Sequence, residues 1–449
     1  MNVLTKRVLL VSDTTSSVNW GGRSASPALQ QHLAQQFKNI ELLPCRFSRT
    51  PRAIQTVLPS SLANALFLRR LRYGLLKIYC HYEEIFGAKD DFIELDPSKS
   101  AENILRNRNT RYIRNLFEAV SSADVVVVDG NGDLIFRTPP GRIPLFNLAV
   151  IELASRLGKE IYYVNSIFSD CPMTGRNLEF LQYAVSSLSK CRAVVFRDAS
   201  SLELARSVAP QLKTQLIPDS LFLWHSLVRD AAAKAPEHGG LVIPNSHHAA
   251  ASNSSLQIDR PYACISGSSH AAFYQEEAVE AYSRLAVAVQ ARLGMNVYLV
   301  PTCRGDRFLS EVAERTALPI IPVEIPVITG AAILAGAQVY ITGRYHPAIL
   351  ASHGGTPCVF LGADSHKTSS LQQLLQYERL QTFSPLPSAE EAEQIASLAL
   401  ERLREGAALR QRVRDAARDC AQEASKLGEL IAGTRVSNRA AVEENLAEV

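Results

Sequence analysis

Two residues with anion-binding chemistry, Arg344 and His346, stand one residue apart between an apolar run that ends at Thr342 and a proline, Pro347. Proline suits the first turn of a helix. Arginine offers a fork of donors to a carboxylate or phosphate, and the histidine proton titrates near neutral pH. Together with the free N–H groups of a helix start, these side chains predict a site for a small, phosphorylated anion. The alternative is an arginine paired with a core carboxylate and a histidine bonded to backbone.

Three further ionisable residues follow apolar runs elsewhere in the chain. They are Arg197, Asp219 and Lys367. Arg197 could point into a cleft, whereas its neighbour Asp198 is expected to cap the next helix. Asp219 could belong to a turn or to a site, and Lys367 could be an ordinary loop lysine. We therefore treat Arg197, Asp219 and Lys367 as candidates.

Two glycine-containing loops also follow strand-like runs. One loop reads Asp-Gly-Asn-Gly-Asp and lacks the full Gly-x-Gly-x-x-Gly of nicotinamide-binding proteins. Either loop could bring backbone close to a ligand, or could be a plain turn. The candidate residues in the two loops are Asn19, Gly21, Asp129, Gly130, Asn131 and Gly132.

The elements that must position these residues alternate between buried strands and helices, which indicates parallel sheets. The first series has expected strands at Arg7–Ser12, Asp124–Asp129, Glu160–Asn165 and Ala193–Phe196 and helices at Ser26–Phe37, Phe146–Leu157, Leu178–Leu188 and Asp198–Val208. The second has expected strands at Ala263–Ser266, Asn296–Val300, Gln338–Thr342 and Pro357–Leu361 and helices at Glu276–Leu293, Asp306–Ala317 and Pro347–His353.

These two series predict two Rossmann-like, doubly wound α/β domains that face a central cleft. We expect an N-terminal domain at 1–230 on the acceptor side with an insertion near 46–120, a C-terminal domain at 231–385 on the donor side, and a helical tail at 386–449. Ligands of such sheets bind beyond the carboxyl ends of the strands. The candidate residues all lie at such ends.

Composition narrows the function classes. The chain has 449 residues and a net charge of only +3, so its overall charge does not favour binding to nucleic acid. Its eight cysteines include no Cys-x-x-Cys pair, and no metal-ligand constellation stands out. No run of about 18 apolar residues predicts a transmembrane helix. We expect a cytoplasmic protein. The basic and apolar segment Leu66–Lys77 is either a surface helix or a contact with a membrane at its inner face.

The ordered motifs resemble the polysaccharide pyruvyltransferase family over roughly residues 7 to 375. The strongest match is Thr342-Gly-Arg-Tyr-His346, followed by Gly355-Thr-Pro357, a strand and Lys367. The other matches are Arg197-Asp198 with Ser201, Pro218-Asp219, the glycine turn at 130–132 and Asn19-Trp-Gly21. Two positions depart from the pattern, because Gly22 replaces the usual acid and Asn131 interrupts the usual triple glycine.

The resemblance implies a fold like that of two-domain (GT-B) glycosyltransferases, with phosphoenolpyruvate as donor substrate and no cofactor. The expected partner is a sugar or lipid-linked glycan, which receives the pyruvyl group as a ketal while phosphate is released. Arg197, Arg344, His346 and Lys367 would hold the donor. His346 is the candidate acid or phosphate partner, and Asp129 and Asp219 are candidate bases.

Two other classes of function remain open from the sequence. A glycosyltransferase could hold the diphosphate of a nucleotide sugar with the same arginine and histidine. A non-catalytic relative could bind a glycan without reaction. The acceptor sugar, its linkage and the oligomeric state do not follow from the sequence.

Overall fold

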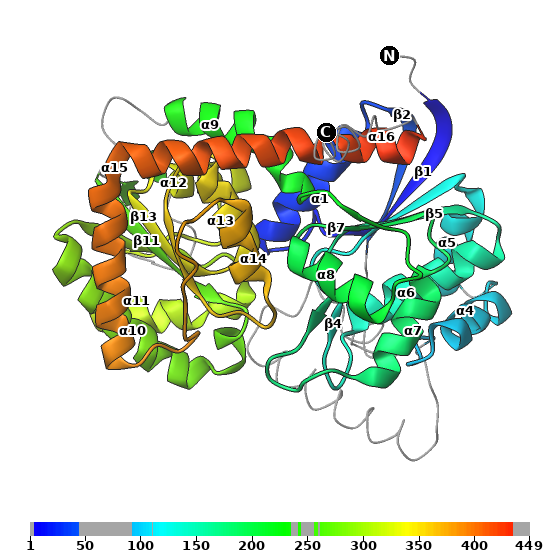
Figure 1. The fold of residues 1–449 in the computed structure, drawn as a ribbon, viewed down its shortest axis with the longest axis horizontal. Helices are drawn as coiled ribbons and strands as arrows, with labels where there is room; N and C mark the ends of the chain where they lie inside the picture. The colour runs from blue at the N-terminus through cyan, green and yellow to red at the C-terminus, as the bar shows by residue number, and fades with distance from the viewer. Residues whose placement is uncertain are drawn as a thin grey trace, which may run out of the picture.

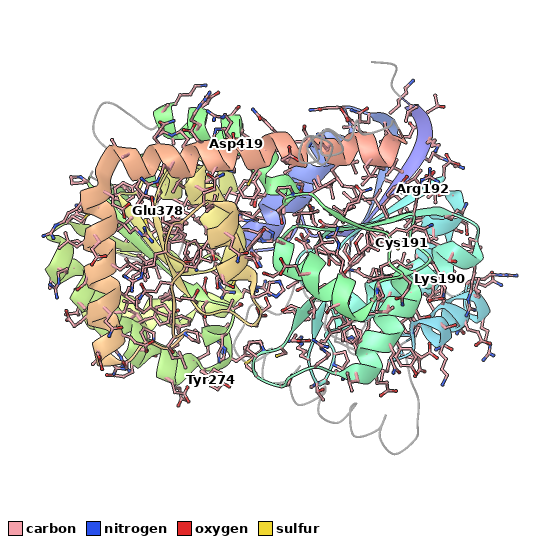
Figure 2. The ribbon with its side chains drawn as sticks, viewed as in Figure 1. Lys190, Cys191, Arg192, Tyr274, Glu378 and Asp419 are labelled. Carbon is pink, nitrogen blue, oxygen red and sulfur yellow. The ribbon has the colours of Figure 1, made fainter. Side chains whose placement is uncertain are left out.

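The computed structural model describes residues 4–44, 92–109, 111–234, 241–243, 256–258 and 261–433. Two α/β lobes lie side by side, and long helices run along one side of both (Figure 1). Side chains fill the interior of each lobe (Figure 2). The predicted basic segment Leu66–Lys77 and much of the predicted insertion lie outside the described residues.

The N-terminal lobe is built on a six-stranded parallel sheet in the order β2-β1-β3-β5-β7-β8. Its central strand β3 (Val125–Asp129) is buried along its whole length, as its β-branched run predicts. The other strands are β1 (Leu4–Asp13), β2 (Phe37–Pro44), β5 (Glu160–Ser166), β7 (Ala193–Phe196) and β8 (Thr214–Leu216). The helices are α1 (Trp20–Leu33), α4 (Pro97–Arg106), α5 (Arg111–Ser122), α6 (Arg142–Arg156), α7 (Leu178–Leu188) and α8 (Ala199–Val208).

The C-terminal lobe has a five-stranded parallel sheet in the order β12-β11-β13-β14-β15. The strands are β11 (Tyr262–Ser268), β12 (Asn296–Leu299), β13 (Val339–Gly343), β14 (Cys358–Leu361) and β15 (Thr382–Phe383). The helices are α10 (Gln275–Leu293), α11 (Phe308–Thr316), α12 (Val327–Gly336), α13 (Tyr345–Ser352) and α14 (Lys367–Leu374). The predicted fold class of two Rossmann-like domains is confirmed.

Short elements connect the lobes and extend their loops. The 3-10 helix η2 (Ser220–Trp224) and α9 (His225–Lys234) lead out of the N-terminal lobe. Strand β9 (Leu241–Ile243) pairs antiparallel with β10 (Leu256–Ile258). The remaining elements are β4 (Ile135–Phe136), β6 (Ser169–Asp170), η3 (Ala271–Phe273) and η4 (Arg304–Asp306).

The first predicted helix was placed too late. It begins at Trp20 rather than Ser26, because the Asn19 side chain accepts a hydrogen bond from the Gly21 N–H and caps the helix there. Pro27 therefore lies inside the helix, and Phe37 starts a strand. Five of the described α-helices were not predicted: α4, α5, α9, α12 and α14. Of these, α12 is apolar on all sides and so shows no helical period, and α14 is short.

The C-terminal helices join the two lobes. Helix α15 (Ala389–Ala424) packs on α10, bends at Gly406, and crosses to the N-terminal lobe (Figure 1). There Leu427 and Ile431 of α16 (Lys426–Ala432) enter the same apolar cluster as Leu10 of β1. The described part of the predicted tail, up to residue 433, thus packs on both lobes.

The start of α1 is fastened to the C-terminal lobe by Trp20. Its ring is fully buried, its indole N–H donates to the Val323 carbonyl at 2.8 Å, and its backbone N–H donates to Thr302 at 2.9 Å. Gly330 allows this approach, since a Cβ there would lie 2.4 Å from the ring. The Arg23 guanidinium adds bonds to two carbonyls of the same segment. The first loop of the N-terminal lobe is therefore fixed against the other lobe.

We expect Trp20→Ala to lower the free energy of unfolding by about 3–5 kcal/mol, because it leaves a large cavity between the lobes. Chemical denaturation followed by circular dichroism measures this change. Leu178, whose side chain is 64% exposed, provides the control, and Leu178→Ala should stay within about 0.5 kcal/mol of wild type. Equal effects of the two substitutions would show that Trp20 does not hold the lobes together.

Candidate functional site

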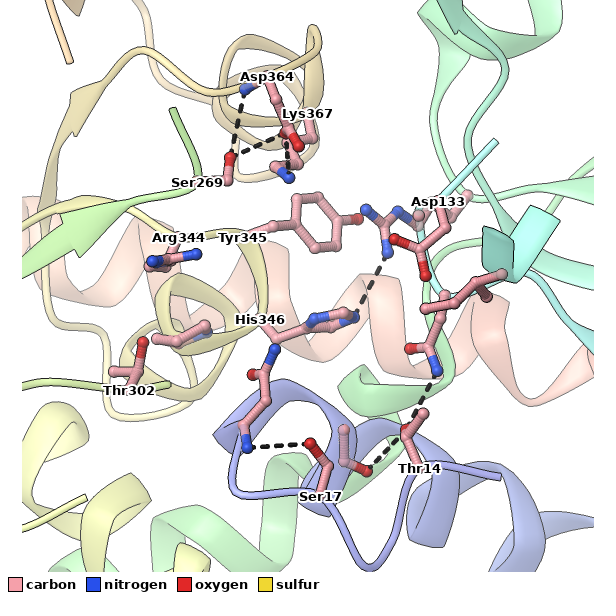
Figure 3. Close-up of a pocket in the computed structure, with 17 residues that line it drawn as sticks. Thr14, Ser17, Asp133, Ser269, Thr302, Arg344, Tyr345, His346, Asp364 and Lys367 are labelled. Atoms are coloured by element: carbon pink, nitrogen blue, oxygen red, sulfur yellow. Dashed lines mark hydrogen bonds and ion pairs between the residues drawn. The ribbon is translucent and has the colours of Figure 1, made fainter. Parts of the chain in front are cut away.

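A pocket of about 340 Å³ lies between the lobes, at the carboxyl ends of strands from both sheets (Figure 3). Loops after β1, β3 and β7 form one wall, and loops after β11, β12, β13 and β14 form the other. The residues that line it are Thr14, Ser17, Asn19, Gly22, Asn131, Gly132, Asp133, Ile143, Arg197, Ser269, Thr302, Arg344, Tyr345, His346, Pro347, Asp364 and Lys367. The pocket therefore stands where parallel sheets place their ligands.

Arg344 is held at the pocket by a buried carboxylate. It precedes the first residue of α13, and its guanidinium donates through Nε to Asp306 Oδ1 at 3.1 Å and through Nη2 to the same oxygen. The second oxygen of Asp306 accepts from the N–H and the hydroxyl of Thr302. Burial lowers the pKa of Arg344, but Asp306 outweighs that effect and raises it above the ordinary value. Arg344 is a fixed positive charge.

Lys367 is held in a similar way on the other side of the same wall. Its ammonium group donates to Asp364 Oδ1, which also accepts from the Ser269 hydroxyl at 2.8 Å. Burial favours the neutral acid at Asp364, yet the charge of Lys367 overcomes it and lowers the pKa of Asp364 to about 2. Asp364 therefore remains ionised through the physiological range.

One buried carboxylate, Asp219, joins Arg197 of the N-terminal lobe to His346 of the C-terminal lobe beneath the pocket. Its Oδ2 atom lies 3.0 Å from Arg197 Nη1 and 3.3 Å from His346 Nε2, and the two nitrogens lie 3.4 Å apart. Burial raises the pKa of Asp219, but His346 and Arg197 overcome it and hold the pKa at about 2. The Arg197 guanidinium also stacks 3.7 Å over the ring of Tyr345. Arg197 is thus fixed by the N-terminal lobe and covered by α13 of the other.

His346 is the titratable group of this cluster. Burial lowers its pKa below the ordinary value, although Asp219 acts in the opposite direction. Its ring rests on the start of α1, where a Cβ on Gly21 would lie 2.5 Å from Nδ1. With its pKa lowered in this way, His346 is neutral near pH 7. An anion bound among these cations would favour its protonated form.

A second polar contact crosses between the lobes beside the pocket. His366 Nε2 donates to Asp198 Oδ1 at 3.0 Å and lies 3.1 Å from the Ser201 hydroxyl. Asp198 also caps α8, as predicted. The neighbours of this pair in sequence are Arg197 and Lys367. Because Asp198 and His366 are bonded to each other, the two cations beside them are kept at a fixed separation across the cleft.

The structure brings most of the candidates from the sequence into one pocket. Arg344, His346, Arg197, Lys367, Asn19, Asn131 and Gly132 line it; Gly21 backs onto the His346 ring, and Gly130 packs beside Ser166. The two nominated carboxylates, Asp129 and Asp219, are fully buried and do not line the pocket. Asp133, Ser269 and Thr302 line it without having been singled out, although each also follows a strand.

Asp129 has a defined place behind the pocket. It accepts hydrogen bonds from Ser26 and from the N–H of Asn131, and the Asn165 amide lies 3.4 Å away. Burial, reinforced by the charge of Asp219, raises its pKa to about 7.

Among the described residues, no group of three side chains is arranged to hold a metal ion.

The family of the chain is shown by its sequence as a whole. The family model for polysaccharide pyruvyl transferase matches residues 21–365, which include Arg197, Arg344 and His346 of the pocket. The chain belongs to the polysaccharide pyruvyl transferase family. It is therefore a member of a transferase family that acts in polysaccharide biosynthesis. No curated protein sequence matches this member significantly.

Solved structures show the same fold at low sequence identity. A UDP-GlcNAc 2-epimerase from Neisseria meningitidis, bound to UDP-GlcNAc, is 9% identical, with a TM-score of 0.52 and coverage of 97% of this chain and 100% of the epimerase. The apo structure of OtsA is 10% identical, with a TM-score of 0.51 and coverage of 95% and 99%. The family member thus has the GT-B arrangement of two Rossmann-like domains.

In the part of the chain that the structure describes, no helix combines the length and apolarity needed to cross a bilayer.

We expect His366→Ala to weaken the binding of inorganic phosphate by about tenfold, the equivalent of one lost hydrogen bond. The physical reason is that Arg197 and Lys367 are no longer held at a fixed separation. Isothermal titration calorimetry measures the affinity. His366→Gln, which keeps a donor for Asp198, should recover most of it; unchanged affinity in His366→Ala would show that the contact does not position the cations.

Proposed function

We propose that this protein transfers the pyruvyl group of phosphoenolpyruvate to a sugar of a glycan or glycan precursor, with formation of a pyruvate ketal and release of phosphate. The observation that carries the proposal is the convergence of Arg197, Arg344 and Lys367, together with His346, on one pocket between two lobes. Phosphoenolpyruvate carries about three negative charges near neutral pH, so several cations must replace its water. Family membership supports the same reaction class.

The cations are arranged to hold one small molecule with two anionic groups. Arg344 and Lys367 are each tied to a carboxylate of the C-terminal lobe, and Arg197 is tied to Asp219 of its own lobe. A phosphate and a carboxylate attached to the same carbon can therefore meet separate cations without any of them moving far. Such pre-arranged charges stabilise the developing phosphate as it leaves.

The reaction requires two proton movements in addition to the change of bonds. The methylene carbon gains a proton, both hydroxyl oxygens of the acceptor form bonds to the central carbon, and the bond from that carbon to the phosphate oxygen breaks. The two acceptor hydroxyls release two protons. One of them makes up for the proton that the methylene carbon takes, and the other leaves with phosphate. We assign His346 as the acid, because a bound anion raises its pKa and makes it a donor.

The N-terminal wall has the chemistry of an acceptor subsite. Thr14, Ser17, Asn19 and Asn131 present hydroxyl and amide groups without charge. Such groups recognise sugar hydroxyls by hydrogen bonds. We assign this wall to the sugar or lipid-linked glycan, and we place the reaction in the cytoplasm, at the inner membrane face for a lipid-linked acceptor.

Two alternatives are tested together with the proposal. A nucleotide-sugar transferase is favoured by the similarity in fold to a protein bound to UDP-GlcNAc. A glycan-binding relative without activity would keep the pocket but release no phosphate. We expect phosphoenolpyruvate at 100 times its dissociation constant to stabilise the protein by about 2.7 kcal/mol. UDP-glucose should give no shift in the thermal transition; stabilisation by the nucleotide sugar alone would contradict the proposal.

The role of Arg344 in donor binding can be separated from its role in folding. Arg344→Ala leaves the buried carboxylate of Asp306 without its cation, which costs about 3–5 kcal/mol of stability. We expect the double variant Arg344→Ala with Asp306→Asn to regain most of that stability while phosphoenolpyruvate binding stays about 10- to 100-fold weaker than in wild type. Calorimetric titration and thermal unfolding measure the two effects. Recovery of donor binding in the double variant would show that Arg344 serves only the fold.

A further inference from the structure

One carboxylate at the pocket has no assigned role. Of the two carboxylates among the lining residues, Asp364 is bonded to Lys367 and Ser269. The other, Asp133, makes no side-chain hydrogen bond or ion pair with any residue that the structure describes. Figure 3 shows it across the pocket from Arg344 and Lys367. A carboxylate that faces three cations and bonds to none of them is available to a ligand.

The backbone of the glycine turn fixes the place of Asp133. Asn131 and Gly132 both have left-handed conformations, with φ of 48° and 76°, and the Asp133 N–H bonds back to the Gly130 carbonyl at 3.0 Å. Gly132 passes directly over Arg197, because a Cβ there would lie 2.4 Å from Nη2. The turn therefore carries Asp133 over the Arg197 guanidinium and into the pocket.

We infer that Asp133 is the general base that removes a proton from an acceptor hydroxyl as that hydroxyl attacks the central carbon of the donor. The inference rests on the proposed pyruvyl transfer. Asp133 takes one hydroxyl proton as the carbon–oxygen bond forms. It returns that proton to the departing phosphate when the bond from the central carbon to the phosphate oxygen breaks. The second hydroxyl proton balances the one delivered to the methylene carbon.

The two carboxylates nominated from the sequence fit this role less well. Asp129 has no exposed surface and is surrounded by Ser26, Asn131 and Asn165, so a hydroxyl does not reach it. Asp219 is equally buried and is occupied by Arg197 and His346, which make it a very weak base. Of these three, only Asp133 lines the pocket.

The environment of Asp133 suits proton transfer near neutral pH. Burial raises its pKa to about 6, and the charge of Lys367 limits the rise. Efficient general bases have pKa values near the working pH. The charged and titratable groups that act on it or share the pocket are Lys367, Asp364, Arg197, Arg137, Arg344 and His346.

The test compares Asp133→Asn with wild type in phosphate release from phosphoenolpyruvate across methyl glycosides of glucose, galactose and mannose. We expect kcat to fall by about 100-fold or more, the usual contribution of a general base, while phosphoenolpyruvate binds at least as tightly as before. The wild-type rate should fall as the pH decreases through about 6, and this decrease should be absent from the variant. Asp230→Asn on α9, an exposed carboxylate, is the matched control and should behave as wild type.

A second measurement needs no acceptor. Sulfate does not titrate between pH 5 and 8, so its affinity reports the charge of the pocket. At pH 7.5 Asp133→Asn should bind sulfate several-fold more tightly than wild type, because one negative charge is removed. Equal sulfate affinity, or a kcat within threefold of wild type, would overturn the assignment of Asp133. Failure of phosphoenolpyruvate to stabilise the wild-type protein would instead overturn the proposed function.

Discussion

The whole site depends on one buried carboxylate, Asp219, that is shared by an arginine of one lobe and a histidine of the other. A buried charge without a partner is costly, so Arg197 and His346 are held against it and against each other. Because the arginine belongs to the N-terminal lobe and the histidine to the C-terminal lobe, this contact also fixes how the lobes face each other. The burial of Trp20, the Asp198–His366 bond and the return of α16 act on the same boundary.

Each fixed cation of the pocket has its own carboxylate: Asp219 for Arg197, Asp306 for Arg344 and Asp364 for Lys367. These pairs place the cations without occupying every donor, so a ligand meets charges that are already oriented. Pre-arranged charges need no reorganisation when a phosphate departs. Asp133 differs because it lacks such a partner among the described residues. We therefore assign Asp133 to proton transfer, whereas the three paired carboxylates hold the cations in place.

Much of the fold and of the anion site could be predicted from the sequence. The Val-rich run of β3 and the alternation of strands and helices specify parallel sheets. Parallel sheets bring the residues after Phe196, and those after Gly343 and Leu361, to the carboxyl edges of the two sheets. The features that the sequence did not predict depend on contacts between residues that lie far apart in the sequence. The early start of α1 requires the insertion of Trp20 into the other lobe, and the bond between Asp198 and His366 joins residues of both sheets. Asp133 was taken as part of a turn, because only the folded chain shows that this turn lies over Arg197.

The central claim is that the protein breaks the bond between the central carbon of phosphoenolpyruvate and its phosphate oxygen. Phosphoenolpyruvate labelled with oxygen-18 at that bridging oxygen tests it directly, with mass spectrometry of the products formed in the presence of sugar acceptors. Ketal formation places the label in the released phosphate. Label retained in pyruvate would show that the bond between phosphorus and oxygen breaks instead. That result, or the absence of phosphate release with every acceptor, would contradict the account.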